Sequence, residues 1–312
     1  MSVAVVGAGA WGKNLVRNLH EMGVLEAVAE LSPQLRTELS AAYPDVTAHA
    51  EWTPVLRSDI PAVVVATPAP THYEIAKAFL ERDKDVFVEK PMTLSASEAQ
   101  DLVKVAEARK RVLMVGHLLL YQPAVQWMRN AVESGMIGRL RSIHQRRLGL
   151  GRARSAENVL WSLGVHDIAV ALYLVGGLPV SVDANGQCVL QSGIEDDVHL
   201  YMSFPQGVHT HLHCSWLWPE RERGAVLVGE KGMLVYNELE QTVRLHRKTI
   251  DSALKNVDGG SEVVYQGSAE PLKLELSHFL DCVANRKAPL SDGLSGLEVV
   301  RVLQTASQRL NG

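Results

Sequence analysis

The stretch Asp85-Val86-Phe87-Val88-Glu89-Lys90-Pro91 decides how the rest of this chain is read. Its apolar centre predicts a buried strand, which is followed by a carboxylate, an amine and a proline. In an open parallel sheet, ligands bind beyond the carboxyl ends of the strands, so Lys90 would lie beside the ligand. Because proline cannot continue the ladder of hydrogen bonds, Lys90-Pro91 is a candidate for a cis peptide in a fixed turn. The alternative is an ordinary solvated lysine at a strand end.

Length and composition indicate a two-domain globular protein. A chain of 312 residues is too long for one ordinary core, and we expect domains over residues 1–118 and 119–312. Hydrophobic residues make up 46% of the chain and charged residues 21%, as is typical of globular proteins. The net charge of −4 supplies no positive field, which argues against a nucleic-acid partner.

The cysteines and the apolar segments bear on the compartment. Cys188, Cys214 and Cys282 are scattered and form no C-x-x-C pair, so neither a disulfide framework nor a cysteine zinc site is indicated. Strand-like sequence begins at Ser2, which leaves no room for the regions of a signal peptide. No apolar run approaches the length that spans a membrane. We therefore expect a cytoplasmic protein with no membrane partner.

The sequence Gly7-Ala8-Gly9-Ala10-Trp11-Gly12 is a G-x-G-x-x-G motif between an expected strand, residues 2–6, and an expected helix, residues 11–22. In such a motif Gly7 permits the tight turn, Gly9 lets the backbone approach a pyrophosphate, and Gly12 lets the helix pack against the strand. The helix N-terminus faces the phosphate charge. Gly7, Gly9, Ala10, Trp11 and Gly12 are therefore predicted to bind a dinucleotide.

Glu30 ends the second expected strand, residues 24–30, at the spacing of a ribose-binding carboxylate. No arginine immediately follows it, and its charge would repel the 2′-phosphate of NADP. We therefore predict NAD as the cofactor. The alternative is a glycine-rich turn followed by an incidental acid.

Strands and helices continue to alternate up to residue 116. Helices are expected over residues 33–43, over residues 71–81 with Thr71 as the N-cap, and after the capping box of Ser95 and Glu98; strands are expected over residues 62–66, 85–88 and 112–115. This order predicts an α/β fold with a doubly wound parallel sheet, a Rossmann domain. Thr67, Pro68, His72, Glu89 and Lys90 would lie along its carboxyl edge, near the nicotinamide. His72 would equally fit a surface position in its helix, and we favour that role.

The second half predicts a different architecture. Helices are expected over residues 122–134, 160–175, 272–285 and 294–310, and strands over residues 140–148, 181–190, 198–204, 208–216, 225–229, 233–236 and 243–246. Residues 251–261 are polar and glycine-rich and are expected to form a mobile loop. The pattern predicts an α/β domain with an open-faced, mostly antiparallel sheet. A second subunit commonly buries such a free face, so we expect a homodimer or homotetramer.

Two features of this half point to chemistry. His166, in Gly164-Val165-His166-Asp167, opens an apolar helix and could take a hydroxyl proton during hydride transfer; the alternative is a satisfied buried histidine. An arginine group without intervening acids consists of Arg139, Arg141, Arg146, Arg147, Arg152 and Arg154. Such a run is usually a solvated face. Gly149-Leu150-Gly151 would nevertheless let the loop close over an anion, and Arg152 and Arg154 could then hold a diphosphate.

A histidine pattern suggests a metal site, which we discount. His209, His211 and His213 alternate on one expected strand and therefore share a face. Same-face neighbours on one strand are about 7 Å apart, too far to converge easily on one ion. We therefore predict no metal.

Taken together, the glycine motif with Glu30, Thr67-Pro68, Glu89-Lys90-Pro91 and Gly164-Val165-His166-Asp167 resemble the Gfo/Idh/MocA oxidoreductases over essentially the whole chain. The resemblance implies a Rossmann domain joined to an open-faced α/β domain, dimers or tetramers through the free sheet face, and oxidation of sugar or polyol carbons with NAD(P). It also implies that Lys90 orients the reacting hydroxyl and lowers its pKa, and that His166 is the acid/base. Many members carry an aspartate where this chain has Ser162, which puts a second acidic role in doubt.

Within the family, three stretches are similar to the nucleotide-sugar 3-dehydrogenases: residues 116–121, 148–161 and 214–217. This similarity implies a UDP-sugar substrate oxidised at C3 and a partner aminotransferase that makes a 3-amino sugar for lipid A-type glycolipids. Arg152 and Arg154 would then hold the diphosphate, with Asn158 and Tyr121 beside the sugar. A dehydrogenase of a free sugar or cyclitol, which needs no diphosphate site, remains an alternative, as does a nucleotide-sensing regulator that has lost catalysis.

Overall fold

The computed structural model describes residues 1–151 and 153–310. The first half of the chain forms a six-stranded sheet, whose strands are β1 (Val3–Val6), β2 (Leu25–Ala29), β3 (Thr47–His49), β4 (Ala62–Val65), β5 (Asp85–Glu89) and β6 (Leu113–Gly116). Their order is β3-β2-β1-β4-β5-β6 and every pair is parallel. β1, β4 and β5 are buried along their whole length, as apolar runs covered on both faces must be. The predicted doubly wound parallel sheet is confirmed.

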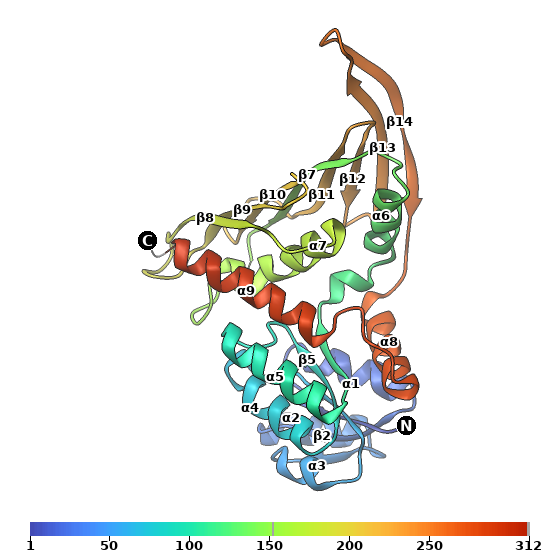
Figure 1. The fold of residues 1–312 in the computed structure, drawn as a ribbon. Helices are drawn as coiled ribbons and strands as arrows, with labels where there is room; N and C mark the ends of the chain where they lie inside the picture. The colour runs from blue at the N-terminus through green and yellow to red at the C-terminus, as the bar shows by residue number, and fades with distance from the viewer. Residues whose placement is uncertain (152, 311–312) are drawn as a thin grey trace. The chain divides into compact units, whose positions relative to one another are not determined.

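Helices connect these strands, as Figure 1 shows: α1 (Gly12–Glu21), α2 (Pro33–Ala42), α3 (Thr53–Arg57), α4 (His72–Glu81) and α5 (Ala96–Arg109). The Ser95 hydroxyl caps α5 by accepting a hydrogen bond from the Glu98 amide at 3.3 Å, as predicted. Thr71 is the N-cap residue of α4, as predicted, but its side chain makes no capping hydrogen bond. The Thr71 hydroxyl instead donates to the oxygens of Pro68 and Thr67, both at 2.8 Å, because a short 3-10 turn, η1 (Ala69–Thr71), precedes the helix.

The chain divides by its packing into two units, and the first includes a late segment. It consists of Met1–Leu118 and Pro271–Val300, so α8 (Pro271–Asn285) and the start of α9 (Gly293–Leu310) belong to it. The Phe279 ring lies 5.8 Å from the Phe87 ring, and Arg286 donates to both carboxylate oxygens of buried Asp85 at 2.8 and 2.9 Å. We expected Pro271–Val300 to belong to the second domain, residues 119–312, but it packs with the first unit. Its contacts there are with the buried carboxylate of Asp85 and with the apolar side chain of Phe87.

The second unit, Leu119–Glu270 with Arg301–Gly312, contains an eight-stranded sheet. Its strands are β7 (Leu140–Leu148), β8 (Ser181–Gln187), β9 (Asp197–Ser203), β10 (His209–Ser215), β11 (Glu222–Gly229), β12 (Met233–Asn237), β13 (Thr242–Ile250) and β14 (Asn256–Gln266). The order is β14-β13-β12-β11-β7-β10-β9-β8, and β7 pairs parallel with β10 while the other pairs are antiparallel. The predicted mostly antiparallel sheet is confirmed.

One face of this sheet is buried and the other is open. In Figure 1, α6 (Pro123–Glu133) and α7 (Val165–Val175) lie along the same side of the sheet. On β10 the residues Thr210, Leu212 and Cys214 are buried, whereas His209, His211 and His213 alternate with them and are more exposed. This period-two alternation is what a half-buried strand requires.

The prediction of a mobile loop over residues 251–261 is wrong. Most of that segment belongs to β14, which pairs antiparallel with β13 from Thr242↔Gln266 to Ile250↔Asn256, with two register shifts. Nine of the eleven β14 positions are exposed, so the composition resembles that of a loop. The strand arises because backbone hydrogen bonds to β13 form whatever the side chains are.

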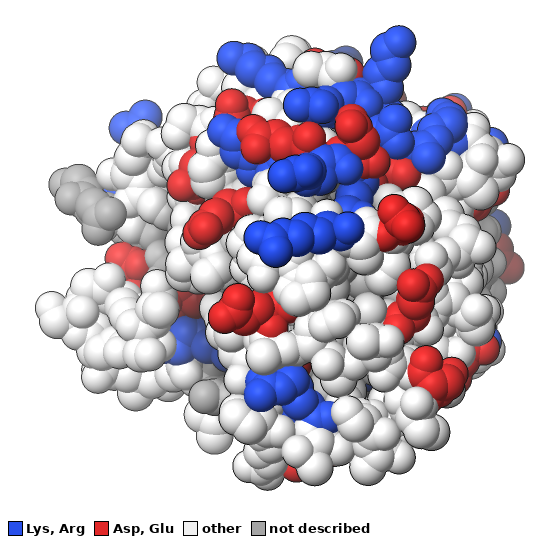
Figure 2. Space-filling view, turned by 90° about the horizontal axis from the view of Figure 1, so that it is seen from below, with Lys and Arg blue, Asp and Glu red and all other residues white. Residues whose placement is uncertain are grey.

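Surface charge is mixed. Figure 2 shows one face of the molecule, on which lysines and arginines lie interspersed with acidic side chains. Among the helices of the described residues, none is long and apolar enough to cross a membrane.

Candidate active site

The glycine-rich loop between β1 and α1 has a geometry that requires glycine. Gly7 has φ +94°, and a Cβ on it would lie 2.7 Å from the Ala66 oxygen. A Cβ on Gly12 would lie 2.1 Å from the Gly7 oxygen. Around Gly9, by contrast, no described atom would come within 4 Å of an added Cβ, so a ligand can approach its backbone. The N-terminus of α1 therefore faces a space where a pyrophosphate fits.

Glu30 is held beside this loop. Its carboxylate accepts hydrogen bonds from the amides of Ala8, at 2.8 Å, and Ser32, at 2.9 Å. Arg36 donates to the backbone oxygens of Glu30 and Leu31 at 2.7 and 2.8 Å, so it lies near the carboxylate although it is six residues on. A carboxylate oxygen can accept more than one hydrogen bond, so Glu30 can also bind ribose hydroxyls. These residues fit NAD.

The glycine-rich loop is tied to the end of β5. The Trp11 indole Nε1 donates to Glu89 Oε1 at 2.5 Å, and the Lys90 amide donates to Glu89 Oε2 at 3.1 Å. Burial raises the pKa of Glu89, while the hydrogen bond from Trp11 and the charge of Lys90 oppose the rise. The Lys90-Pro91 bond is cis, as the sequence indicated, and Lys90 is half-buried. The turn thus holds Lys90 at the carboxyl edge of the sheet.

The surface position that we favoured for His72 is wrong. Its side chain is buried, with Nδ1 2.8 Å from the Pro91 oxygen and Nε2 2.8 Å from the Thr67 oxygen. Because both neighbours are carbonyl oxygens, both contacts can be hydrogen bonds only if both ring nitrogens carry protons. His72 therefore links the turn after β4 to the turn after β5.

Two buried titratable groups of the first unit were not predicted. Glu275, on α8, is fully buried, and its carboxylate oxygens have no hydrogen-bond partner among the described residues. Burial, assisted by the charge of Glu89, raises its pKa well above the ordinary value. One signal was available: Leu272, Glu275, Leu276 and Phe279 follow the i, i+3, i+4, i+7 spacing of a buried helix face.

His117, which directly follows β6, is the second buried titratable group that was not predicted. Both ring nitrogens lack a hydrogen-bond partner among the described residues, and the side chain is buried. Burial and the nearby Lys90 charge lower its pKa to about 3, so the ring is neutral at pH 7. The sequence marked residues 116–121 as a distinctive stretch but assigned no role to this histidine.

In the second unit, His166 occupies the first turn of α7, directly after a π-helical turn, η3 (Leu160–Gly164). A Cβ on Gly164 would lie 2.6 Å from Leu160 Cδ1 and 2.9 Å from Cys214 Sγ. The glycine therefore lets this segment pack against β10, and that packing sets the position of His166, which is half-buried. π-helical turns occur frequently at functional sites.

Other predicted substrate residues of the second unit have internal partners. Asn158 Oδ1 accepts a hydrogen bond from the Trp161 amide at 3.1 Å, and its Nδ2 donates to Glu195 at 2.7 Å. Tyr121 is only 3% exposed. The Ser162 hydroxyl donates to the Val159 oxygen at 3.3 Å. Asn158 thus starts the π-helical turn, and a role for it at the sugar would need one of these bonds to be shared.

The described arginines of the group do not share one site. Arg147 is buried in ion pairs with Asp167 and, at 2.7 Å, Glu238, so Asp167 neutralises an arginine. The other arginines have separate partners: Arg141 pairs with Glu230, Arg146 with Glu222, and Arg139 donates to the Gln206 oxygen. Arg154 is half-exposed, 3.8 Å from Glu157. Arg152 lies outside the described residues. Strand register separates arginines that are close in sequence, because alternate residues face opposite sides.

The sheet order, the glycine-rich loop and Glu30 define the first unit as an NAD-binding Rossmann domain of an oxidoreductase. Residues 1–117 match the family described as "Oxidoreductase family, NAD-binding Rossmann fold", and residues 125–235 match the "GFO/IDH/MocA C-terminal domain". The chain belongs to the Gfo/Idh/MocA family, and it is an enzyme. The resemblance inferred from its motifs is thereby confirmed.

Individual relatives are distant. UDP-N-acetylglucosamine 3-dehydrogenase of Acidithiobacillus ferrooxidans is 26% identical over 96% of this chain and 94% of its own length. The NAD-dependent scyllo-inositol 2-dehydrogenase of Bacillus subtilis is 28% identical over 74% of this chain and 70% of its own. A solved structure of the Acidithiobacillus enzyme superposes with a TM-score of 0.87, covers 99% of this chain and 98% of its own, and is 24% identical, which shows a shared fold.

Proposed function

We propose that this enzyme oxidises the C3 hydroxyl of UDP-N-acetylglucosamine to the 3-keto sugar with NAD. The observation that carries the proposal is the similarity to UDP-N-acetylglucosamine 3-dehydrogenase along nearly the full length of both chains. The inositol dehydrogenase, although slightly more identical, matches about three quarters of this chain. The similarity to the nucleotide-sugar enzyme therefore covers more of this chain than the similarity to the inositol enzyme does.

The chain's own residues supply the acid–base chemistry in this proposal. Lys90, at the end of β5, orients the reacting hydroxyl and stabilises the negative charge that develops on its oxygen. His166, in the first turn of α7, takes the hydroxyl proton as general base. When bound, NAD accepts the hydride from C3. Gly7, Gly9, Ala10, Trp11 and Gly12 hold the pyrophosphate, and Glu30 holds the ribose.

The remaining predicted contacts belong to the same proposal. Thr67, Pro68, Glu89 and Lys90 would contact the nicotinamide end of the cofactor, with His72 acting through Thr67 and Pro91. Arg152 and Arg154 would hold the diphosphate, and Tyr121 and Asn158 would lie near the sugar. The half-exposed side chain of Arg154 supports its proposed contact with the diphosphate, because its 3.8 Å ion pair with Glu157 is weak.

A dehydrogenase of a free sugar or cyclitol is the second candidate. It is favoured by the arginine pairing, because acids engage Arg141, Arg146 and Arg147. Of the two arginines predicted to hold a diphosphate, the described one, Arg154, also lies 3.8 Å from an acid, Glu157. If the substrate carries no diphosphate, Arg154→Ala will leave the KM unchanged. If the substrate is a UDP sugar, the variant will raise the KM about tenfold or more, as expected for a lost charge-assisted contact.

We further propose a partner enzyme and an assembly. A 3-keto sugar is a substrate for an aminotransferase that makes a 3-amino sugar, which would enter a lipid A-type glycolipid. The open sheet face, with Tyr201 44% exposed, would be covered by a second copy in a homodimer or homotetramer. The reaction would take place in the cytoplasm, which suits the free Cys188, Cys214 and Cys282.

The test measures NADH absorbance with NAD and UDP-N-acetylglucosamine, in the presence of glutamate and a partner aminotransferase that removes the 3-keto product. Wild type is compared with Lys90→Ala, His166→Ala and the exposed-lysine control Lys104→Ala. We expect rates about 10²- to 10⁴-fold lower for Lys90→Ala and His166→Ala, and an unchanged rate for the control. Parallel reactions contain myo-inositol, scyllo-inositol or glucose in place of the UDP sugar.

The outcomes separate the candidates. NADH formation with the UDP sugar alone supports the nucleotide-sugar activity. Turnover of a cyclitol or free sugar, with no calorimetric binding of the UDP sugar, would replace it with the second candidate. Equal activity of wild type and Lys90→Ala would remove the lysine from the mechanism.

A further inference from the structure

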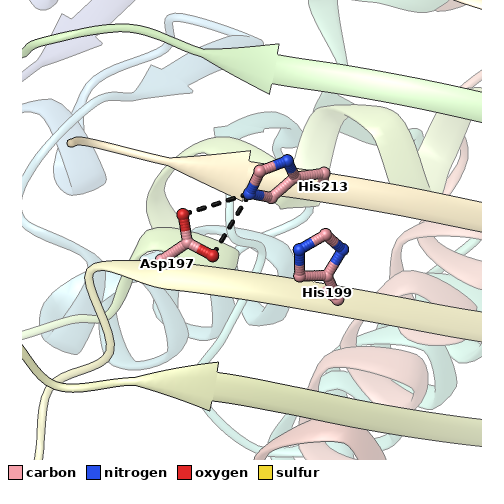
Figure 3. Close-up of side chains that lie close together, drawn as sticks. All are labelled: Asp197, His199 and His213. Atoms are coloured by element: carbon pink, nitrogen blue, oxygen red, sulfur yellow. Dashed lines mark hydrogen bonds and ion pairs between the residues drawn. The ribbon is translucent and has the colours of Figure 1, made fainter. Parts of the chain in front are cut away.

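A polar cluster lies on the open face of the second unit's sheet, apart from the residues assigned to NAD and substrate. It consists of Asp197 and His199 on β9 and His213 on β10 (Figure 3). His199 and His213 are directly opposite each other in the antiparallel pairing, and Asp197 is two residues before His199 on the same face. Directly opposite side chains have Cβ atoms only about 5 Å apart, closer than neighbours along one strand.

The three side chains already converge. The His213 Nε2 atom lies 3.0 and 3.2 Å from the two Asp197 carboxylate oxygens, and the His199 and His213 rings stack with centroids 4.0 Å apart. One ligand atom from each residue can be chosen so that all lie within 4.8 Å of one another. In a tetrahedral zinc site with bonds of about 2.0–2.2 Å, ligand atoms are about 3.3–3.6 Å apart. The ligand atoms of Asp197 and His213 nearly have this spacing. Rotation of the His199 side chain would bring its ring nitrogen to a similar distance from both.

We propose that Asp197, His199 and His213 form a binding site for one divalent transition-metal ion of the Zn²⁺ type. Two imidazoles and a carboxylate are ligands that Zn²⁺ accepts, and water fills the fourth position. His213 binds through Nε2 with its proton on Nδ1, and the ion takes the place of the hydrogen bond to Asp197. The site is complete within one chain and needs no residue from the proposed active site. Its role is structural, since the ion links β9 to β10.

The discounted histidine pattern and this site share only His213. His209 and His211 stay outside the group because they follow the spacing of a single strand, as argued from the sequence. His211 instead stacks on His144 of β7, with centroids 4.6 Å apart. His144 and His211 lie on the same face of the sheet but do not belong to the group of Asp197, His199 and His213. His144 and His211 therefore provide matched controls for nonspecific binding to surface imidazoles.

The experiment titrates metal-free protein with ZnCl₂ by calorimetry and follows the melting temperature with and without Zn²⁺. Co²⁺ serves as a second probe, because its visible absorption reports tetrahedral coordination. The proteins are wild type, Asp197→Asn, His199→Ala, His213→Ala and the controls His144→Ala and His211→Ala. Circular dichroism of each metal-free variant verifies folding.

We expect one Zn²⁺ per wild-type chain, a melting temperature raised by Zn²⁺, and a Co²⁺ spectrum of the tetrahedral type. Each of the three ligand variants should bind at least about tenfold more weakly and lose the Zn²⁺-dependent rise in melting temperature, while both controls should behave as wild type. Absence of binding to wild type would overturn the proposal. So would equal weakening by His144→Ala or His211→Ala, which would indicate nonspecific imidazole binding.

Discussion

The indole nitrogen of Trp11 lies 2.5 Å from Oε1 of Glu89 and donates a hydrogen bond to it. The bond joins two turns that are 78 residues apart in the chain, the glycine-rich loop and the turn that carries Lys90. Burial raises the pKa of Glu89, and the hydrogen bond from Trp11 opposes this rise. The glycine-rich loop and the turn that carries Lys90 are thereby linked.

Trp11→Phe is predicted to weaken NAD binding. The variant keeps an aromatic ring but loses its hydrogen bond to the Glu89 carboxyl group, and a typical hydrogen bond contributes about 0.5–1.5 kcal/mol. We expect the Kd for NADH, measured by calorimetry, to rise about tenfold, with the fold retained. Trp127→Phe, in the second unit, is the control and should leave the Kd unchanged. An unaltered Kd in Trp11→Phe would show that the loop holds its position without this bond.

Glu30→Ala is predicted to reduce the preference for NAD over NADP. The carboxylate repels a 2′-phosphate and binds ribose hydroxyls, so its removal should lower the NAD/NADP ratio of kcat/KM by about tenfold or more. Arg36, close to Glu30, would then be available to the phosphate. Glu26→Ala, an exposed position on β2, is the control. A ratio that stays constant in Glu30→Ala would contradict the assignment of the ribose site.

Gly164→Ala is predicted to destabilise the second unit and to impair catalysis. The added methyl group would overlap Leu160 and Cys214, and overpacking of this kind costs about 1–3 kcal/mol. The segment would shift away from β10 and carry His166 with it. Urea unfolding and kcat measure the two effects. At Gly177 the nearest contact of an added Cβ is an ordinary 3.5 Å, so Gly177→Ala should change neither quantity. Normal stability of Gly164→Ala would argue against the packing constraint.

Glu275→Gln is predicted to stabilise the protein at alkaline pH. The folded state raises the pKa of Glu275, so it retains a proton that the unfolded chain loses above about pH 4.5. Wild-type stability should therefore fall as the pH rises from that value, by up to about 1.4 kcal/mol per pH unit, until the raised pKa is reached. Thermal unfolding at pH 5 and pH 8 measures this. The variant should exceed wild type at pH 8, with the gap shrinking toward pH 5.

The control for this prediction is Glu81→Gln, because Glu81 is exposed at the end of α4. Its effect should be small and the same at both pH values. A pH-independent gap between Glu275→Gln and wild type would mean that Glu275 stays ionised in the fold.

Much of the first unit could be predicted from local sequence. Gly7 and Gly12 occupy positions that leave no room for a side chain, and Glu89-Lys90-Pro91 lies at and just after the end of a buried strand. Such signals lie within a few residues of one another. They can therefore be recognised without knowledge of the long-range packing.

The second unit shows where local reasoning fails. Asn256–Gln266 has the composition of a loop and forms a strand, because β13 supplies its hydrogen bonds. Arg139, Arg141 and Arg146 are close together in sequence, but each has a different partner, either an acid or a carbonyl oxygen. These partners are far from the arginines in the sequence, so neighbouring charges in the sequence do not identify them.

Several features could be predicted from the sequence alone: the alternation of strands and helices in the first unit, the mostly antiparallel sheet of the second, and the glycine-rich loop. The position of Lys90 after a buried strand and that of His166 at a helix start were also predictable. These follow from the periodicity and stereochemistry of neighbouring residues. Only the tertiary structure decided that His72 is buried between two carbonyl oxygens, that Pro271–Val300 packs with the first unit, and that Asp197 and His199 meet His213. Those contacts depend on strand register and long-range packing, in which residues far apart in the chain satisfy each other's buried polar groups.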